Sequence, residues 1–523
     1  GIAARYHFAK ALYRLGHLHA ALTELDRVLA AGRETRYFAA ALEWCLFIGR
    51  KMEDDVAVNR VLSRYEDAPP PPKYRDEFLF RLARYHYRRA LVADRQADAP
   101  APPPPPPDDE EGISFEADPF AEAPPPEGGD EGGISFEDDP FGEAAAPPSV
   151  AEGLGAEAHR EAARRLVLRV APDSRYGARA KFVEGLLLVT DRRDNDALAA
   201  FKAVVEATRD PAEGERDVER RRRERLRELA FFQLARLHFG AQQPSFSIFY
   251  YRKVDRDSPE WLDALYEESW AEYRLGRHER ALGNLLTVNA PFFEDTYFPE
   301  SLILKAVIYY ENCRYEEAGT IIGDFLERFE PVLERLRRMA SESRTPEGWY
   351  EVLAEMRQQA EEAPAGDGQV QVARVLALAL SDPELRRLTG AIEAVSAEMA
   401  ALERAASSPP LSSVARMADL RASLDATRAE LRAEAGRAME RKLRFEAAAV
   451  RTLISQALRV RVETARAEEG RLEASLGRRR QRPKQVDREV EDFTDDEKVV
   501  WPFEGEYWRD ELGTYELSLA RTC

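Results

Sequence analysis

The sequence has no long hydrophobic run and only three cysteines, and each absence excludes a class of protein. No stretch of the 523 residues approaches the roughly 18 uninterrupted apolar residues that a membrane-spanning helix needs. Cys45, Cys313 and Cys523 lack the paired spacing of a zinc site or a dithiol redox pair. We expect Cys45 and Cys313 to be packing residues, and Cys523 is a candidate free thiol.

Recognisable catalytic motifs are also missing. The chain has no phosphate-binding loop, no His-Glu-x-x-His, no Gly-x-Ser-x-Gly and no dinucleotide fingerprint. Its seven histidines are scattered along the sequence and suggest no set of metal ligands. We therefore expect a protein that is not an enzyme, with no catalytic residues, no metal and no cofactor.

What the chain does have is enough apolar sequence for several modules. Hydrophobic residues make up 44% and charged residues 33% of the chain, which fits a helix-rich protein of more than one domain. The sequence opens Gly-Ile-Ala-Ala without a methionine, so we expect that an upstream segment has been removed. The compartment stays open: periplasm or cell envelope if that segment was a signal, and cytoplasm otherwise.

A short pattern recurs within the apolar parts of the chain. The ten residues from Tyr13 (YRLGHLHAAL) recur from Tyr273 (YRLGRHERAL) and, more loosely, from Tyr310 (YENCRYEEA). Each copy fits a helix, a tight turn and a second helix that approaches the first closely over a small side chain. The turn residues are Gly16, Gly276 and, in the divergent copy, Cys313. The small contact residues are Ala21, Ala281 and Ala318.

This pattern resembles the tetratricopeptide repeat (TPR), in which helix A ends in a Leu-Gly pair and helix B carries an early alanine. Ala281 and Ala318 are 37 residues apart, close to the repeat length of that family. The resemblance implies an all-α fold, a TPR-like α-solenoid with a groove along its A helices that binds peptides or helices. Candidate groove residues are Tyr85, Arg88, Phe232, Arg236, Trp270 and Tyr273. Aromatic residues at helical spacing also suit the core between repeats, so that interpretation stays open for each of them.

Composition divides the chain into six regions. We predict TPR-like repeats over 1–99 and 151–335, a disordered acidic Pro/Gly-rich insert over 100–150, a helical connector over 336–380, an antiparallel helical hairpin or coiled coil over 381–480, and an aromatic C-terminal tail over 481–523. A helix A without its helix B precedes the insert, and a helix B without its helix A follows it. The insert is therefore expected to loop out of a single repeat.

The insert carries a duplicated acidic and aromatic motif, in which GISFEADPF at Gly112 recurs 21 residues later as GISFEDDPF. Residues 101–150 contain fourteen Asp and Glu and no Lys or Arg, so most of the net charge of −19 lies here. Two copies suggest a bivalent linear motif for a basic partner surface. A duplicated linker without a partner, or one that lies in the protein's own groove, explains the pattern equally. The motif residues are Ile113, Phe115, Phe120, Ile134, Phe136 and Phe141.

Heptad spacing dominates residues 381–480. Leu385, Leu388 and Ile392 begin one apolar seam after a Ser-Asp-Pro-Glu cap, and a longer helix is expected from about 413 to 476. The pattern allows this hairpin to close on itself, on the repeats or on a second copy, so self-association through 381–480 is one possibility. Arg and Glu alternate along the second helix, which favours a solvated face over nucleic-acid binding.

The tail is rich in large aromatic residues, which are costly to expose. We expect Trp501, Phe503, Tyr507 and Trp508 to dock on the protein's own surface or on a partner. The repeats, hairpin and tail together resemble large bacterial TPR proteins, some associated with gliding-motility machinery, which implies an envelope scaffold. The sequence thus predicts a non-catalytic protein–protein interaction scaffold. A structural coiled-coil assembly factor of a bacterial envelope complex is the alternative, and an unrecognised enzyme is the third interpretation.

Overall fold

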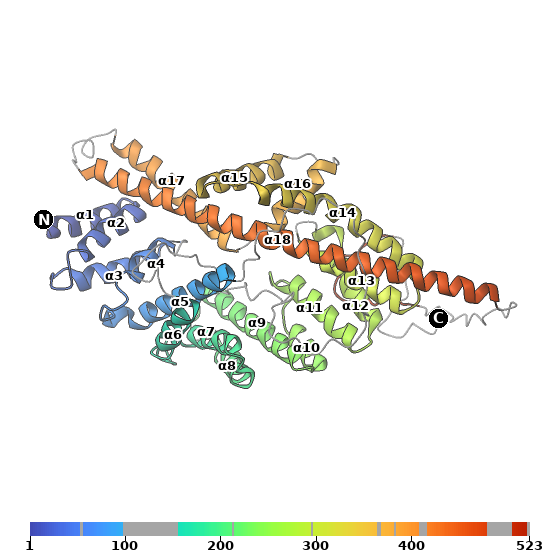
Figure 1. Cartoon of the computed structure of the whole chain (residues 1–523). Helices are drawn as coiled ribbons and strands as arrows, with labels where there is room; N and C mark the ends of the chain where they lie inside the picture. The colour runs from blue at the N-terminus through green and yellow to red at the C-terminus, as the bar shows by residue number, and fades with distance from the viewer. Residues whose placement is uncertain are drawn as a thin grey trace. The chain divides into compact units, whose positions relative to one another are not determined.

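All regular secondary structure in the described part of the chain is helical. The computed structural model describes all residues except 53–55, 98–154, 212–213, 294–295, 363–367, 381–382, 407–415, 478–504 and 520–523. Within the described residues there are eighteen α-helices, two short 3₁₀ helices (Pro72–Tyr74 and Pro291–Phe293) and no strand (Figure 1). The predicted all-α class is confirmed. None of the described helices combines the length and apolar character needed to cross a bilayer.

The chain folds into two compact units. The first consists of residues 1–237 and 332–449, and the second of residues 238–331 and 450–523. The first unit contains α1 (Ile2–Arg14), α2 (Leu18–Leu29), α3 (Phe38–Gly49), α4 (Val56–Ser63), α5 (Arg75–Ala97), α6 (Ala156–Val167), α7 (Gly177–Thr190), α8 (Asp194–Ala207), α15 (Pro346–Glu362), α16 (Gly368–Ala379) and α17 (Pro383–Ala406). The second contains α10 (Pro244–Tyr251), α11 (Trp261–Arg274), α12 (His278–Val288) and α13 (Pro299–Glu311). Both units include parts of α9 (Asp217–Gly240), α14 (Tyr315–Ser341) and α18 (Arg416–Gly477).

The same turn joins two consecutive helices at five places. Its central residue has a positive φ: Gly16 (86°), Arg192 (55°), Gln242 (58°), Gly276 (70°) and Cys313 (59°). The N–H group that follows donates to the carbonyl five residues earlier, at 2.9 Å from His17 to Leu12 and 3.0 Å from Arg277 to Glu272. This left-handed cap pairs carbonyls that the end of a helix leaves free. The recurrence at Arg192 and Gln242 is not visible in the sequence pattern, because neither residue is glycine and neither is preceded three residues earlier by the tyrosine of the recognised copies.

A small residue is buried five positions after each of these turns. Ala21, Ala197, Ser247, Ala281 and Ala318 are all 0% exposed. A larger side chain would hold the second helix of the pair away from its neighbours, because protein interiors are already close-packed. One turn and one small contact residue therefore recur together along the chain.

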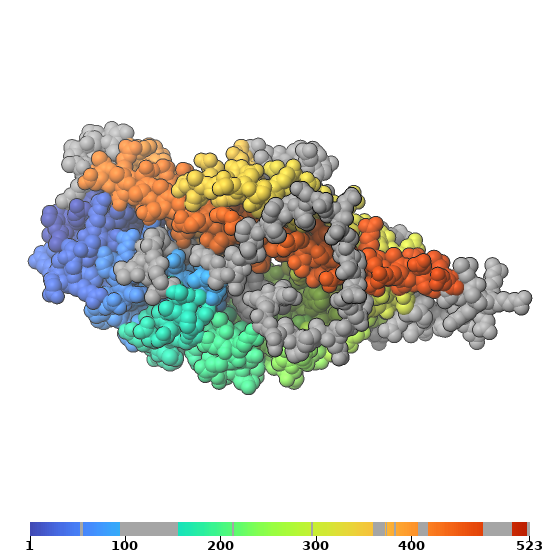
Figure 2. All heavy atoms as spheres, viewed as in Figure 1, coloured from blue at the N-terminus to red at the C-terminus, as the bar shows by residue number. Residues whose placement is uncertain are grey.

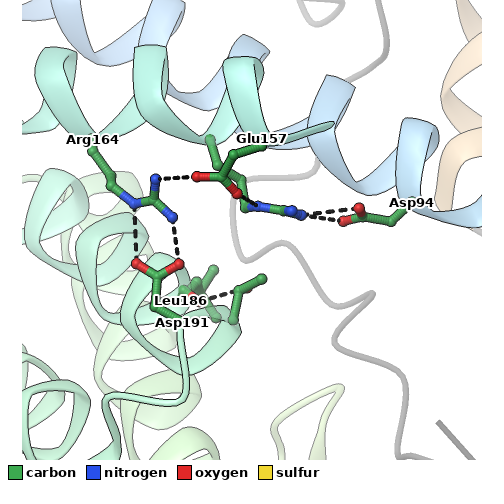
Figure 3. A network of polar contacts seen from close by, with 7 residues as sticks. Asp94, Glu157, Arg164, Leu186 and Asp191 are labelled. Atoms are coloured by element: carbon green, nitrogen blue, oxygen red, sulfur yellow. Dashed lines mark hydrogen bonds and ion pairs between the residues drawn. The ribbon is translucent and has the colours of Figure 1, made fainter. Parts of the chain in front are cut away.

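The helices on either side of the insert pack directly against each other. Arg160 of α6 donates two hydrogen bonds to the Asp94 carboxylate of α5, at 2.9 and 2.7 Å. Arg164 pairs with both Glu157 and Asp191, so the network continues to the end of α7 (Figure 3). The helices α5 and α6, which flank the insert in the sequence, therefore form one packed pair. The insert predicted over 100–150, the disorder expected of it and both motif copies fall on residues outside the described part of the chain.

The helices predicted as a hairpin, α17 and α18, pack on helices near the N-terminus of the first unit: α17 on α2 and α4, and α18 on α4. The Glu398 carboxylate of α17 accepts hydrogen bonds from the main-chain N–H groups of His19 and Ala20, at 2.9 and 2.8 Å. These two groups lie in the first turn of α2 and have no partner within the helix. Arg60 of α4 pairs with Glu430 of α18. Figure 2 shows the orange atoms of α17 against the blue N-terminal helices.

Candidate functional site

A C-terminal segment of the chain lies on the helices of the second unit, and we call residues 505–519 the strap. Tyr515, Leu517 and Leu519 are half-buried, whereas Glu516 and Ser518 between them are exposed. This alternation is typical of an extended chain with one face on a surface. Residues 515–519 of the strap therefore lie on the helices as an extended peptide would, after a turn over 509–514.

The strap approaches α12 most closely at a glycine. A Cβ atom on Gly283 would lie 1.7 Å from the main-chain oxygen of Tyr515, so any other residue at this position would displace the strap. Beside this contact, the N–H group of Leu517 donates to the carbonyl oxygen of Glu279 at 2.9 Å. The main chain of the strap is thus held directly against α12.

Earlier in the strap, Gly513 makes a second close contact. It has a φ of 87°, and a Cβ there would lie 2.6 Å from the Trp261 ring. Its N–H group donates to the hydroxyl oxygen of Thr287 at 2.9 Å. The Arg256 guanidinium lies 5.5 Å from the centre of the Trp261 ring and donates to the carbonyl oxygen of Asp510 at 2.8 Å. Most of these contacts reach the main chain of the strap and do not depend on its side chains.

Apolar contacts complete the docking. Leu517 and Leu519 pack against what we call the apolar cluster of α12 and α13: Ala281, Leu282, Leu285, Leu304 and Ile308. Leu512 is only 3% exposed. Burying half a leucine side chain contributes roughly 1 kcal/mol. The strap is therefore held by a modest apolar contribution together with its hydrogen bonds.

A polar pocket of about 330 Å³ lies beside the strap. Its walls come from α10, α11, α12 and strap residues 513–516, and they include Arg252, Glu268, Arg280 and Asn284. Asn284 is 6% exposed, and its side-chain Nδ2 has no hydrogen-bond partner within the described residues. A buried N–H donor without an acceptor is unfavourable by about 1–3 kcal/mol. One residue of the pocket wall thus carries a buried donor without a hydrogen-bond acceptor among the described residues.

The charged groups of the pocket are largely paired. Arg252 donates to Glu268 and to Glu272, both at 2.7 Å, and Arg280 donates to Glu516 of the strap at 2.9 Å. Burial raises the pKa of Glu268 above its ordinary value, although the nearby Arg252 charge opposes this shift. The arrangement can bind an extended, partly acidic segment, and it contains no paired nucleophile and base.

The structure places the six groove candidates in two environments. Tyr85, Arg88 and Phe232 are buried and offer little surface to a partner. Arg236, Trp270 and Tyr273 are half-buried. Trp270 and Tyr273 pack against the apolar cluster that also receives Leu517 and Leu519 of the strap. The core interpretation therefore fits Tyr85, Arg88 and Phe232, and only the second-unit candidates lie near the strap site.

Of the predicted tail residues, Tyr507 is half-buried and Trp508 is 45% exposed. Trp501, Phe503 and the motif residues Ile113, Phe115, Phe120, Ile134, Phe136 and Phe141 lie outside the described residues. The described strap residues that contact the helices are mainly leucines and glycines. An expectation based on large aromatic residues does not identify them. One signal was available: a glycine inside α12 costs about 1 kcal/mol relative to alanine and often marks a close main-chain approach.

The cysteines differ from each other. Cys45 is free and buried, and burial raises its pKa well above the ordinary value. Cys313 is disulfide-bonded, so the packing role expected for it is wrong. Cys523 lies outside the described residues. Within the described ranges, no group of three or more His, Cys, Asp or Glu side chains is placed to hold a metal ion.

Comparison with known proteins adds no relative from which a role could be transferred. No family model matches the chain, and no curated protein matches it. The function has to be argued from the geometry alone.

Proposed function

We propose that this chain is a TPR-type α-solenoid scaffold that binds other proteins and has no catalytic role. The observation that carries the proposal is the strap, a segment that turns over 509–514, is extended over 515–519 and lies on α11, α12 and α13. A helical surface that accepts an extended segment of its own chain has the shape and hydrogen-bonding groups to accept one from another protein.

The repeated turn gives a second line of support. Five turns with a left-handed central residue, each followed by a buried small residue, fit a chain built from one repeated helix pair. Proteins built in this way generally present long surfaces for partner binding. On this proposal the acidic insert supplies a further binding element through its two GISFE motifs.

The alternative function, a coiled-coil assembly factor, has less support. Self-association through 381–480 requires free faces on α17 and α18. Glu398 of α17 instead caps α2, and α18 approaches the start of α15 so closely that a Cβ on Gly436 would lie 1.6 Å from the Pro346 carbonyl oxygen. Both contacts cover surface of α17 or α18 within the same chain, and this surface is therefore not available to a second copy.

The substitution Gly283→Ala, which adds a single methyl group, tests the scaffold proposal. We expect Gly283→Ala to remove partners from the set that the full chain labels by proximity in its native cells, because the added Cβ occupies the path of any main chain along α12. Gly319→Ala is the matched control, since Gly319 is also helical but has open space around its Cβ position. Identical partner sets for Gly283→Ala and the unchanged chain would contradict the proposal.

A further inference from the structure

The contacts that hold the strap discriminate poorly between sequences. Leu517 and Gly513 bond through their main-chain N–H groups, and Arg256 bonds to a main-chain carbonyl. The side-chain requirements are a glycine at the position of Gly513, aliphatic residues at alternate positions and a carboxylate that accepts from Arg280. Any extended segment with those features can make the same interactions.

The strap also leaves part of its site unused. Asn284 is one of the residues that line the pocket of about 330 Å³, and its buried Nδ2 donor has no acceptor within the described residues. Asn284 is more than nine-tenths buried, so bulk water gives it little compensation. A segment that supplied an acceptor there would gain an interaction that the strap does not make.

The charged side chains of the pocket walls indicate which kind of group could accept a hydrogen bond from Asn284. Glu268 and Glu516 line the pocket, which disfavours a second carboxylate, and Arg252 and Arg280 are already ion-paired. A side-chain amide fits best, because its oxygen can accept from Asn284 while its nitrogen donates to a carboxylate.

We propose that the strap site binds an extended segment of another protein, and that the strap is an exchangeable competitor for it. The partner segment has a glycine at the position of Gly513, aliphatic residues at alternate positions, a carboxylate opposite Arg280, and an Asn or Gln side chain that enters the pocket and bonds to Asn284. This rests on the proposed scaffold function and names the chemistry of its partner. Binding of such a segment releases the strap.

The first test measures competition. A fluorescein-labelled peptide of residues 505–519 is titrated against the full chain and against the full-length Leu517→Asp/Leu519→Asp variant, which weakens the strap and leaves the helices unchanged. We expect the variant to bind the peptide at least about tenfold more tightly by anisotropy, because an intramolecular competitor acts at high effective concentration. Arg256→Ala provides a second weakened strap if the double variant does not fold.

The second test measures the pocket. A peptide carrying Thr514→Gln places an amide at a strap position that lines the pocket. We expect it to bind the weakened-strap chain about fivefold more tightly than the unchanged peptide, a gain of one hydrogen bond. Adding Asn284→Leu to the chain should abolish this gain and leave the affinity of the unchanged peptide intact.

The outcomes separate the two proposals. Equal affinity for the full chain and the weakened-strap variants would overturn strap exchange, as would a Thr514→Gln gain that survives Asn284→Leu. Either result leaves the scaffold function standing if Gly283→Ala still changes the partner set in cells. Tight peptide binding together with an unchanged partner set would instead refute the scaffold function.

Discussion

At the scale of single residues, three turns hold a side chain in the left-handed region of backbone space. Arg192, Gln242 and Cys313 have φ between 55° and 59°, where Cβ crowds the following carbonyl oxygen. This conformation costs roughly 1–2 kcal/mol for a residue other than glycine. The equivalent residues Gly16 and Gly276 avoid that cost. The turn geometry is therefore kept even where the sequence does not favour it.

We predict that Arg192→Gly stabilises the chain by about 0.5–1 kcal/mol, because it removes this crowding at an exposed position. Urea unfolding followed by circular dichroism measures the change. The reciprocal substitution Gly276→Ala should lower the free energy of unfolding by a similar amount. Stabilisation by both substitutions, or by neither, would contradict the role assigned to the turn.

A second residue-scale effect concerns a buried acid. Glu434 of α18 is 8% exposed, and burial together with the nearby Glu384 raises its pKa to about 8, against the opposing charges of Arg89, Arg60 and Arg437. The folded chain therefore keeps a proton that the unfolded chain releases near its ordinary pKa of about 4.5. Because the folded pKa is the higher one, stability is greatest below pH 4.5 for this group and falls as the pH rises towards 8.

The variant Glu434→Gln isolates this contribution. Between pH 5 and pH 8 the unchanged chain should lose stability relative to the Glu434→Gln variant. The difference between their free energies of unfolding should shift towards the variant by more than about 1 kcal/mol. Denaturant titrations at four or five pH values measure it. A difference that is constant across this range would show that Glu434 titrates alike in both states.

At the scale of elements, α17 and α2 are joined by one carboxylate. The Glu398 oxygens accept from the His19 and Ala20 N–H groups, and the His19 ring Nδ1 lies 2.8 Å from the same carboxylate. Burial raises the pKa of Glu398, but these hydrogen bonds outweigh it and hold the pKa below its ordinary value. A negative charge at the start of a helix is also favourable for the helix dipole.

We expect Glu398→Gln to lower the free energy of unfolding by about 1–3 kcal/mol, because the amide carries no charge and one of its two groups cannot accept. Glu403→Gln is the control on the same helix, since Glu403 forms an exposed pair with Arg421 and such pairs contribute about 0–1 kcal/mol. Chemical denaturation compares the two. Equal losses would argue against a special role for the cap.

The element scale also shows what could be read from the sequence. Apolar periodicity predicts the helices and the all-α class, and a Leu-Gly pair predicts the turns at Gly16 and Gly276. The sequence does not predict the turns at Arg192 and Gln242. Neither residue type favours a left-handed conformation, and it is hydrogen bonding that imposes this conformation there. The sequence does not predict the docking of α17 either. A heptad pattern identifies the apolar face of a helix, but it does not show which other helix packs on that face. Glu398 lies off the heptad positions, so its capping role had no periodic signal.

At the scale of the whole molecule, each unit has an element from late in the sequence that lies on helices of the same unit. In the first unit α17 lies on α2 and α4, and in the second the strap lies on α11 to α13. Surfaces that would otherwise be available to a second copy are therefore used within one chain. Apolar surface that is already covered contributes little to association.

From this we predict a monomer at micromolar concentration. Size-exclusion chromatography with light scattering should give a mass near 59.2 kDa for the full chain. We expect dimers or larger oligomers only when the contact of α17 is weakened, as in the Glu398→Gln variant. A stable dimer of the unchanged chain that is lost only on removal of residues 381–480 would contradict this prediction and restore the assembly-factor alternative.

The α5–α6 pair has one more consequence. Its two helices recognise each other through Asp94 with Arg160 and through His86 with His159, whose Nδ1 atoms are 2.9 Å apart. These contacts act through space, so covalent continuity of the chain between residues 97 and 155 is not what brings the helices together. The protein is consequently a natural candidate for fragment complementation: residues 1–97 and 155–523, produced as separate chains, should reassemble into one fold.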